Sequence, residues 1–152
     1  MEITEHQIKL VQSTWEKVVP KSFEISQKFY GKLFEKYPNY KQMFKTDMRE
    51  QGKKLMQMIG TTVLGLTNIG RVTPTLKESG IRHVGYGVTD DDYNKLKPIL
   101  FWSFKDSLPD VFTDEVIDAW NITYDIISNI MIEGTKKEES IFMRVLKKTK
   151  FW

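Results

Sequence analysis

The stretch V-T-P-T-L-K-E-S-G-I-R-H-V-G-Y-G-V, from Val72 to Val88, contains His83, one of only two histidines in the chain. Pro74 predicts a helix start, and two glycines after the histidine predict its end. Leu76 and Ser79 share a helical face with His83. An imidazole in this position can ligate a metal through one nitrogen while the other hydrogen-bonds the Ser79 carbonyl. A lone histidine on an apolar face is also commonly a packed core residue, so other segments must decide between the two.

Length and composition limit the class of protein. A chain of 152 residues fits one domain with a single core. The absence of cysteine excludes disulfides, thiolate metal sites, cysteine catalysis and thioether attachment of a cofactor. The N-terminal residues form no apolar signal segment, and no run approaches the roughly 18 apolar residues of a membrane span. We therefore expect a soluble cytoplasmic protein.

The net charge of +3 is unevenly distributed. Six Lys/Arg residues face only two Glu in the segment from Gly134 onward, so the rest of the chain is nearly neutral. A nearly neutral body has no electrostatic footprint for nucleic acid, and we expect none as a partner.

Helical periodicity runs through every substantial segment, and no segment shows the alternation of a strand. The sequence therefore predicts an all-α protein. Proline breaks, capping residues and glycines divide it into seven or eight helices. The expected segments are Thr4 to Pro20, Ser22 to Pro38, a short turn to Phe44, about Gln51 to Asn68, Pro74 to Gly85, Thr89 to Leu108, Thr113 to Gly134, and a basic amphipathic segment over 134–152.

Several polar and aromatic side chains are predicted to point inward. Gln51 lies one turn before Leu55, on the apolar side of the long helix. Tyr30 and Phe44 precede it on earlier segments, fourteen residues apart, and His83 follows Gln51 by thirty-two residues. A phenol, an inward amide and an imidazole in this order are the parts of a ligand-binding pocket.

Taken together, these features resemble a single-domain bacterial globin, similar to the globin part of flavohaemoglobins and to neuroglobin-like proteins, from Glu5 to about Met131. The resemblance is carried by F-Y-G-K-L-F-E-K-Y-P at 29–38, E-Q-G-K-K-L-M at 50–56, R-H-V-G-Y-G-V at 82–88 and D-A-W-x-x-x-Y at 118–124. Each motif is weak alone, but their order and separations are specific. The resemblance implies a globin fold, a 3-on-3 helical sandwich around a haem b pocket, over residues 1–133, followed by an extension over 134–152.

The resemblance also implies a role for individual residues. It makes His83 the proximal iron ligand and Phe44 the aromatic ring that packs against the porphyrin. Tyr30 and Gln51 would lie over the opposite face, where phenol and amide donors stabilise bound O₂ because its oxygen carries partial negative charge. The other implied haem contacts are Lys54, Leu55, Arg82, Val88, Tyr93 and Leu96, with Lys54 or Arg82 pairing with a propionate.

Two of these assignments have alternatives. Tyr30 can instead be a core tyrosine bonded to a backbone carbonyl. A different register of the long helix would turn Lys54 and Met58, rather than Gln51, toward the iron. A second iron-ligating histidine is not expected, because His6 lies in the first predicted helix.

The predicted function is reversible binding of O₂, and of NO and CO, at ferrous iron, for oxygen transport or nitric oxide detoxification. One alternative is NO dioxygenation with electrons from a separate reductase. Flavohaemoglobins pair the tyrosine corresponding to Tyr93 with a glutamate, and here that position is Thr135, which puts this network in doubt. A third hypothesis is a haem-based gas or redox sensor. The basic segment over 134–152 is a candidate for dimer or membrane-surface contact.

Overall fold

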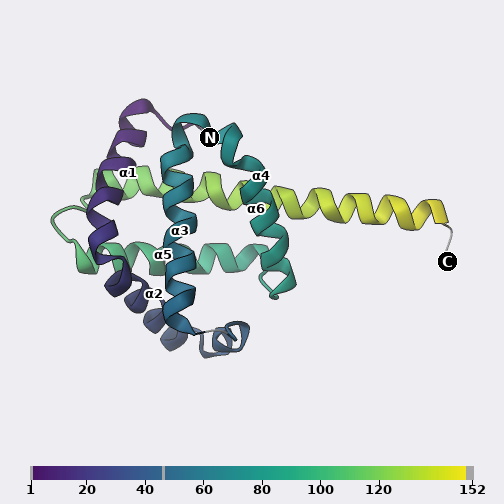
Figure 1. Cartoon of the computed structure of the whole chain (residues 1–152), viewed down its shortest axis with the longest axis horizontal. Coiled ribbons are helices and arrows are strands. Elements are labelled where there is room, and N and C mark those ends of the chain that lie inside the picture. The colour runs from purple at the N-terminus through teal and green to yellow at the C-terminus, as the bar shows by residue number, and fades with distance from the viewer. Residues whose placement is uncertain (1, 46, 150–152) are drawn as a thin grey trace.

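The structure, a computed structural model, describes residues 2–45 and 47–149, with side chains as far as Lys136, and within these ranges its regular secondary structure is helical (Figure 1). Six α-helices and three 3₁₀ segments occur there, so the predicted count of seven or eight helices is too high. In chain order they are α1 (Glu5–Val18), η1 (Val19–Lys21), α2 (Ser22–Lys36), η2 (Pro38–Met43), α3 (Met48–Leu64), η3 (Gly65–Asn68), α4 (Ile69–Gly85), α5 (Asp90–Ser107) and α6 (Asp114–Thr149).

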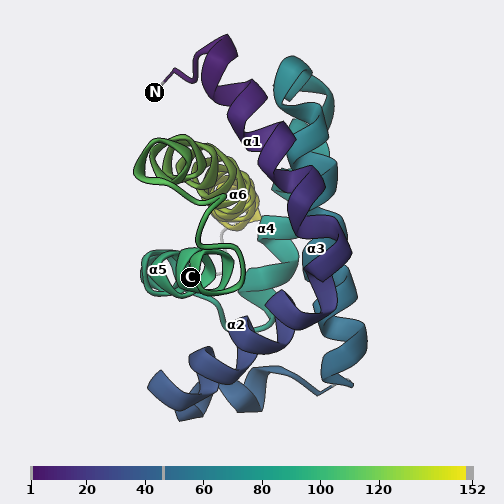
Figure 2. The same ribbon diagram turned by 90° about the vertical axis from the view of Figure 1, so that its left-hand side faces the viewer.

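The helices form two crossed layers. In Figure 1, α1, α3 and α4 run across α5 and α6, and the view of Figure 2 separates α5 and α6 from α1 and α3. The helix α2 packs against both α3 and α5, while α6 packs against α4 and α1. This arrangement is the predicted 3-on-3 sandwich.

Local sequence signals account for several helix ends. At α1, the Thr4 hydroxyl accepts a hydrogen bond from the Gln7 N–H at 3.1 Å, and Gln7 Oε1 accepts one from the Thr4 N–H at 3.0 Å. This capping box satisfies two donors that the helix itself leaves free. A second capping box joins Thr89 and Asp92 at the start of α5. Pro20 lies in η1, which separates α1 from α2.

The helix that carries His83 begins earlier than predicted. It starts at Ile69 and contains Pro74, which was expected to be at its N-terminus. The preceding long helix ends at Leu64, and η3 turns the chain directly into α4. Pro74 is the sixth residue of this helix, beyond the first turn, so it leaves the Gly70 carbonyl without the i→i−4 bond that another residue would donate. The Thr73 hydroxyl also donates to the Ile69 carbonyl at 2.7 Å.

Gly134 does not end the last helix, contrary to the prediction. The helix α6 continues to Thr149 and extends beyond the other helices (Figure 1). A Cβ at Gly134 would lie 2.8 Å from the Lys77 Cα, so glycine is needed here for the close approach of α4. The boundary predicted between residues 133 and 134 therefore falls inside a helix. The apolar face expected over 134–152 falls mainly on side chains outside the described residues.

The core lies between the two layers and is rich in aromatic rings. Trp15 and Trp120 pack with ring centroids 6.1 Å apart, and Phe104 packs edge-on to Trp120 at 5.0 Å. The Trp120 indole N–H donates to the Thr14 hydroxyl at 2.9 Å, so its polar group is satisfied inside the core. This bond ties α1 to α6.

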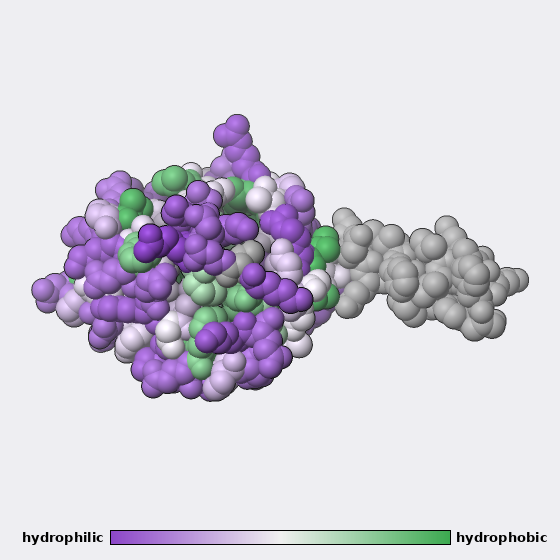
Figure 3. All heavy atoms as spheres, turned by 60° about the horizontal axis from the view of Figure 1, so that its bottom comes forward, coloured by the Kyte–Doolittle hydropathy of each residue, from purple (hydrophilic) through white to green (hydrophobic). Residues whose placement is uncertain are grey.

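Hydrophilic residues cover most of the face shown in Figure 3, and hydrophobic residues gather there in small groups. Exposed large hydrophobic side chains include Ile81, Val84 and Tyr86, in and directly after the last turns of α4. Within the described ranges, none of the helices has the length and apolar character needed to cross a bilayer.

Candidate functional site

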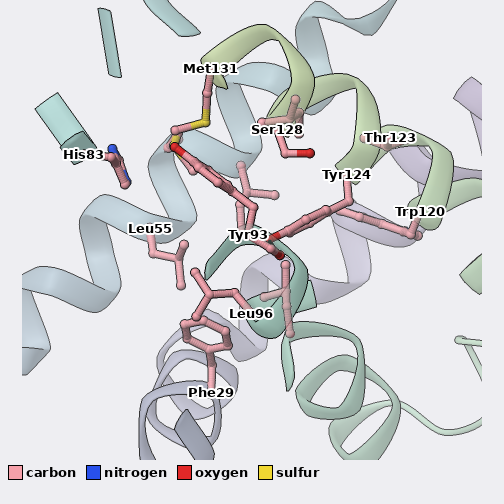
Figure 4. Close-up of a pocket in the computed structure, with 14 residues that line it drawn as sticks. Phe29, Leu55, His83, Tyr93, Leu96, Trp120, Thr123, Tyr124, Ser128 and Met131 are labelled. Carbon is pink, nitrogen blue, oxygen red and sulfur yellow. Dashed lines mark hydrogen bonds between the residues drawn. The ribbon is translucent and has the colours of Figure 1, made fainter. Parts of the chain in front are cut away.

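An apolar cavity of about 110 Å³ lies between α3, α4, α5 and α6. His83 reaches it from α4, Leu55 from α3, and Tyr93 and Leu96 from α5 (Figure 4). These four are residues that the sequence predicted for the site. The sequence did not predict the lining contributed by α2 and α6, which includes Phe29, Trp120, Thr123, Tyr124, Ser128 and Met131.

The His83 imidazole is held in one tautomer. Its Nδ1 lies 2.6 Å from the carbonyl oxygen of Ser79, one turn earlier in α4. A carbonyl can only accept, so Nδ1 carries the hydrogen and Nε2 keeps a lone pair. Among the described residues, no side chain or backbone group hydrogen-bonds Nε2. The predicted bond to the Ser79 carbonyl is confirmed, and the free lone pair belongs to a side chain that lines an apolar cavity.

Tyr30 and Gln51 form a hydrogen-bonded pair between α2 and α3. The Gln51 Nε2 donates to the Tyr30 hydroxyl oxygen at 3.3 Å. The phenol hydrogen then remains free to donate to another group. Tyr30 is only 5% exposed, and this burial raises its pKa to about 12, although the bond from Gln51 opposes the rise. The phenol therefore stays protonated at neutral pH.

Phe44 packs on this pair and does not line the cavity. Its ring lies 5.3 Å from that of Tyr30 and 5.6 Å from that of Phe34. The ring of Phe29, which does line the cavity, packs edge-on to Tyr30 at 5.0 Å. The predicted residues thus fall into two adjoining groups, the cavity around His83 and an aromatic cluster around Tyr30 and Gln51.

The predicted charged contacts lie at the surface. Lys54 is exposed, whereas Gln51 contacts Tyr30, so the geometry agrees with the register that turns Gln51 inward. Arg82 is also exposed and lies 3.4 Å from Glu78 on its own helix. Val88 is half-buried, and its backbone N–H donates to the His83 carbonyl at 3.0 Å.

A buried carboxylate, whose partner was not anticipated from the sequence, links η2 to the start of α5. The Asp92 carboxylate accepts the Tyr40 hydroxyl at one oxygen, and the Thr89 N–H and hydroxyl at the other, at 2.8 and 3.0 Å. Burial alone would raise the pKa of Asp92, but these hydrogen bonds outweigh it and the pKa is lowered. Tyr40 lies in η2, close before Phe44, and Asp92 directly precedes Tyr93. This buried contact therefore ties η2, which leads to Phe44, to the first turn of α5, which carries Tyr93.

Comparison with known proteins establishes the family. The globin family model matches residues 27–131. The chain belongs to the globin family. This globin is 30% identical over 146 residues to an anaerobic nitrite reductase from Gossypium hirsutum, covering 86% of this chain and 90% of that protein. It is 26% identical over 132 residues to a flavohemoprotein from Rhizobium meliloti, covering 85% of this chain but 33% of that protein. The globin thus spans about a third of the flavohemoprotein.

Solved structures agree with the fold. A bacterial globin from Campylobacter jejuni superimposes with a TM-score of 0.80 at 24% identity, covering 90% of this chain and 99% of that one. An engineered carbene transferase from Rhodothermus marinus, provisionally described as a nitric oxide dioxygenase, gives 0.82 at 20% identity, covering 93% and 99%. At these identities the likeness concerns the fold alone, and the predicted globin fold is confirmed.

Proposed function

We propose that this globin binds haem b through His83 and reversibly binds O₂, as well as NO and CO, at ferrous iron. The observation that carries the proposal is the tautomer of His83. With Nδ1–H bonded to the Ser79 carbonyl at 2.6 Å, Nε2 has its lone pair free in an apolar cavity. A neutral imidazole fixed in this way is a ready ligand for haem iron.

The surroundings of His83 suit a large apolar group with charged edges. Leu55, Tyr93 and Leu96 line the cavity, and Val88 follows His83 on the chain. Lys54 and Arg82 are exposed, as residues that pair with propionates at the protein surface need to be. Bound haem would supply a ferrous iron that takes up diatomic gases.

The chain's own contribution to gas retention comes from Tyr30 and Gln51. The phenol hydrogen is free, and the phenol stays protonated because its pKa is raised to about 12. Such a donor stabilises O₂ more than CO, because bound O₂ carries more negative charge on its outer atom. We therefore expect high O₂ affinity with slow release.

The test is reconstitution of the full chain with hemin. The wild-type protein should retain the pigment through gel filtration and show a Soret band that shifts on reduction and on addition of O₂ or CO. His83→Ala should lose most of the pigment, because it removes the one expected bond from protein to iron. His6→Ala is the matched control, since His6 is exposed and paired with Glu115 at 2.9 Å. A His83→Ala variant with an unchanged spectrum would exclude the proposal.

Two catalytic roles have support from relatives. The description of the Rhodothermus marinus protein as a nitric oxide dioxygenase suggests NO dioxygenation, for which this globin would need electrons from a separate reductase. The plant relatives named as anaerobic nitrite reductases, such as the one at 30% identity, favour nitrite reduction. Adding a reductase distinguishes either catalytic role from simple gas binding, because only a catalyst then continues beyond one turnover. Repeated nitrate formation from NO and O₂ would identify the first role, and sustained nitrite consumption without O₂ the second. A single turnover in both assays would leave reversible gas binding.

A further inference from the structure

We propose that the side-chain hydroxyl of Ser79 is a positioning group for the His83 imidazole, in addition to the backbone carbonyl of the same residue. Ser79 would act as a second acceptor for the hydrogen on Nδ1 of His83. The existence of this contact is independent of haem. Its consequence for iron rests on the proposed function.

Ser79 is poorly placed for any role at the surface. It is 5% exposed, and α4 presents it on the same face as His83. Its Oγ lies 3.5 Å from His83 Nδ1 and 3.8 Å from the sulfur of Met58. Met58 comes from α3 and lines the cavity. The hydroxyl is thus enclosed between the imidazole and a thioether on the opposite helix.

The positions of the hydrogens follow from what each atom can do. Nδ1 carries a hydrogen, because its shorter contact is to a carbonyl oxygen at 2.6 Å. The Ser79 Oγ must therefore accept from Nδ1–H, so its own hydrogen is directed elsewhere. The Met58 sulfur has no hydrogen to give and can only accept it. The arrangement is a one-directional chain from His83 to Ser79 to Met58, with a three-centre bond at Nδ1–H.

This chain has two effects on the imidazole. Two acceptors on the same edge restrict rotation of the ring, so Nε2 keeps a fixed direction into the cavity. They also draw the Nδ1 hydrogen away from the ring, which makes Nε2 a stronger electron donor. Because Met58 belongs to α3, the chain connects the helix that carries Gln51 with the helix that carries His83.

The first experiment uses the full chain without haem and follows the His83 ring by nitrogen-15 NMR. Ser79→Ala removes the hydroxyl but keeps the backbone carbonyl. We expect the Nδ1 resonance to shift and the Nδ1 hydrogen to exchange with solvent about three- to tenfold faster, as for loss of one hydrogen bond of ordinary net strength. Ser79→Thr retains a hydroxyl and should restore both values toward those of the wild type.

The matched control is Ser103→Ala. Ser103 is also buried, bonds the Leu100 carbonyl of its own helix at 2.6 Å, and lies outside the cavity lining. It should leave the His83 resonances unchanged. Equal signals in wild type and Ser79→Ala, or equal changes in the two alanine variants, would overturn the proposal.

The second experiment uses the hemin-loaded protein and reads the iron–histidine bond directly. In ferrous Ser79→Ala the iron–histidine stretching frequency should fall and the reduction potential should rise, with Ser79→Thr again restoring both. A change in folding stability alone would not produce this pair of shifts. If the wild-type chain takes up no hemin, the proposed function fails, while the NMR comparison still decides the role of Ser79.

Discussion

The contacts of α4 with α6 and of α3 with α2 are both built on glycine, but the neighbours differ in kind. A Cβ at Gly80 of α4 would lie 2.2 Å from the backbone oxygen of Met131, and one at Gly134 would lie 2.8 Å from the Lys77 Cα. A Cβ at Gly52 of α3 would meet only the Ser26 side chain, whose Oγ is 2.6 Å away. In the first contact backbone meets backbone, whereas in the second a side chain can move aside.

The same difference is found in how the two helices hold their functional side chains. His83 of α4 is fixed by a backbone carbonyl, which no substitution of Ser79 removes. Gln51 of α3 is fixed by a side chain, the Tyr30 hydroxyl. The main hydrogen bond of the group proposed to hold the iron therefore goes to the backbone, while the groups proposed to hold the gas bond each other through side chains that single substitutions remove. Affinity for gas can therefore change in this fold without loss of the cofactor site.

Gly80→Ala should have the largest effect on stability. The added methyl cannot fit against a backbone oxygen, so α4 must separate from α6. We expect a loss of about 2–3 kcal/mol in the free energy of unfolding, even after the gain in helix propensity. Urea unfolding at fixed pH measures it. Gly52→Ala is the control and should lose less, about 1 kcal/mol, because the Ser26 hydroxyl can rotate away only by giving up its 2.9 Å bond to the Phe23 carbonyl. Equal losses in the two variants would remove the distinction between the two contacts.

Tyr30→Phe should have the next largest effect, on O₂ and not on stability. Removing the free phenol hydrogen should speed O₂ dissociation by about tenfold or more, corresponding to about 1.4 kcal/mol. Stopped-flow measurement on the hemin-loaded ferrous protein tests this expectation. CO serves as an internal control, because it is less polar when bound and its dissociation should change less. If O₂ leaves both proteins at the same rate, Tyr30 is only a core residue.

Much of this site could be predicted because its signals are local in sequence. The Ser79 carbonyl is one helical turn from His83, so helix geometry alone predicts their hydrogen bond. The capping box at Thr4 and Gln7 joins residues three apart and is equally local. Gln51 was predicted to face inward from its spacing to Leu55, and it contacts Tyr30.

The rest depends on tertiary neighbours that the sequence does not identify. In the sequence Gly134 looks like a helix C-cap, but in the structure it allows the close approach of α4 to the middle of α6. In the sequence Pro74 looks like a helix start, but η3 turns the chain into α4 five residues earlier, at Ile69. Nothing local in the sequence marks Trp120 as part of the cavity lining, but it lines the cavity because α6 crosses the core there. Asp92 is an ordinary acidic residue in the first turn of its helix by sequence, but its partner Tyr40 is fifty-two residues away.

Tyr40→Phe tests the buried bond between η2 and α5, from the Tyr40 hydroxyl to the Asp92 carboxylate, and should have the smallest effect. Asp92 would keep its two bonds from Thr89 and lose the one from Tyr40, so we expect a loss of about 1 kcal/mol at pH 7. The pKa of Asp92 lies below its ordinary value of 3.8 in the folded protein. Its contribution is therefore present above that ordinary value and is lost as the pH falls through the folded pKa.

The difference in stability between wild type and Tyr40→Phe should accordingly be constant from pH 7 to about 5 and shrink at more acidic pH, as the carboxylate takes up a proton in both proteins. Urea titrations across this range measure it. Tyr37→Phe is the control, because its ring packs against Tyr40 at 5.3 Å while the carboxylate is bonded by Tyr40. A difference that persists unchanged below the pKa would mean that the Tyr40 hydroxyl stabilises the fold whether or not Asp92 is charged, because phenylalanine keeps the ring and its packing against Tyr37.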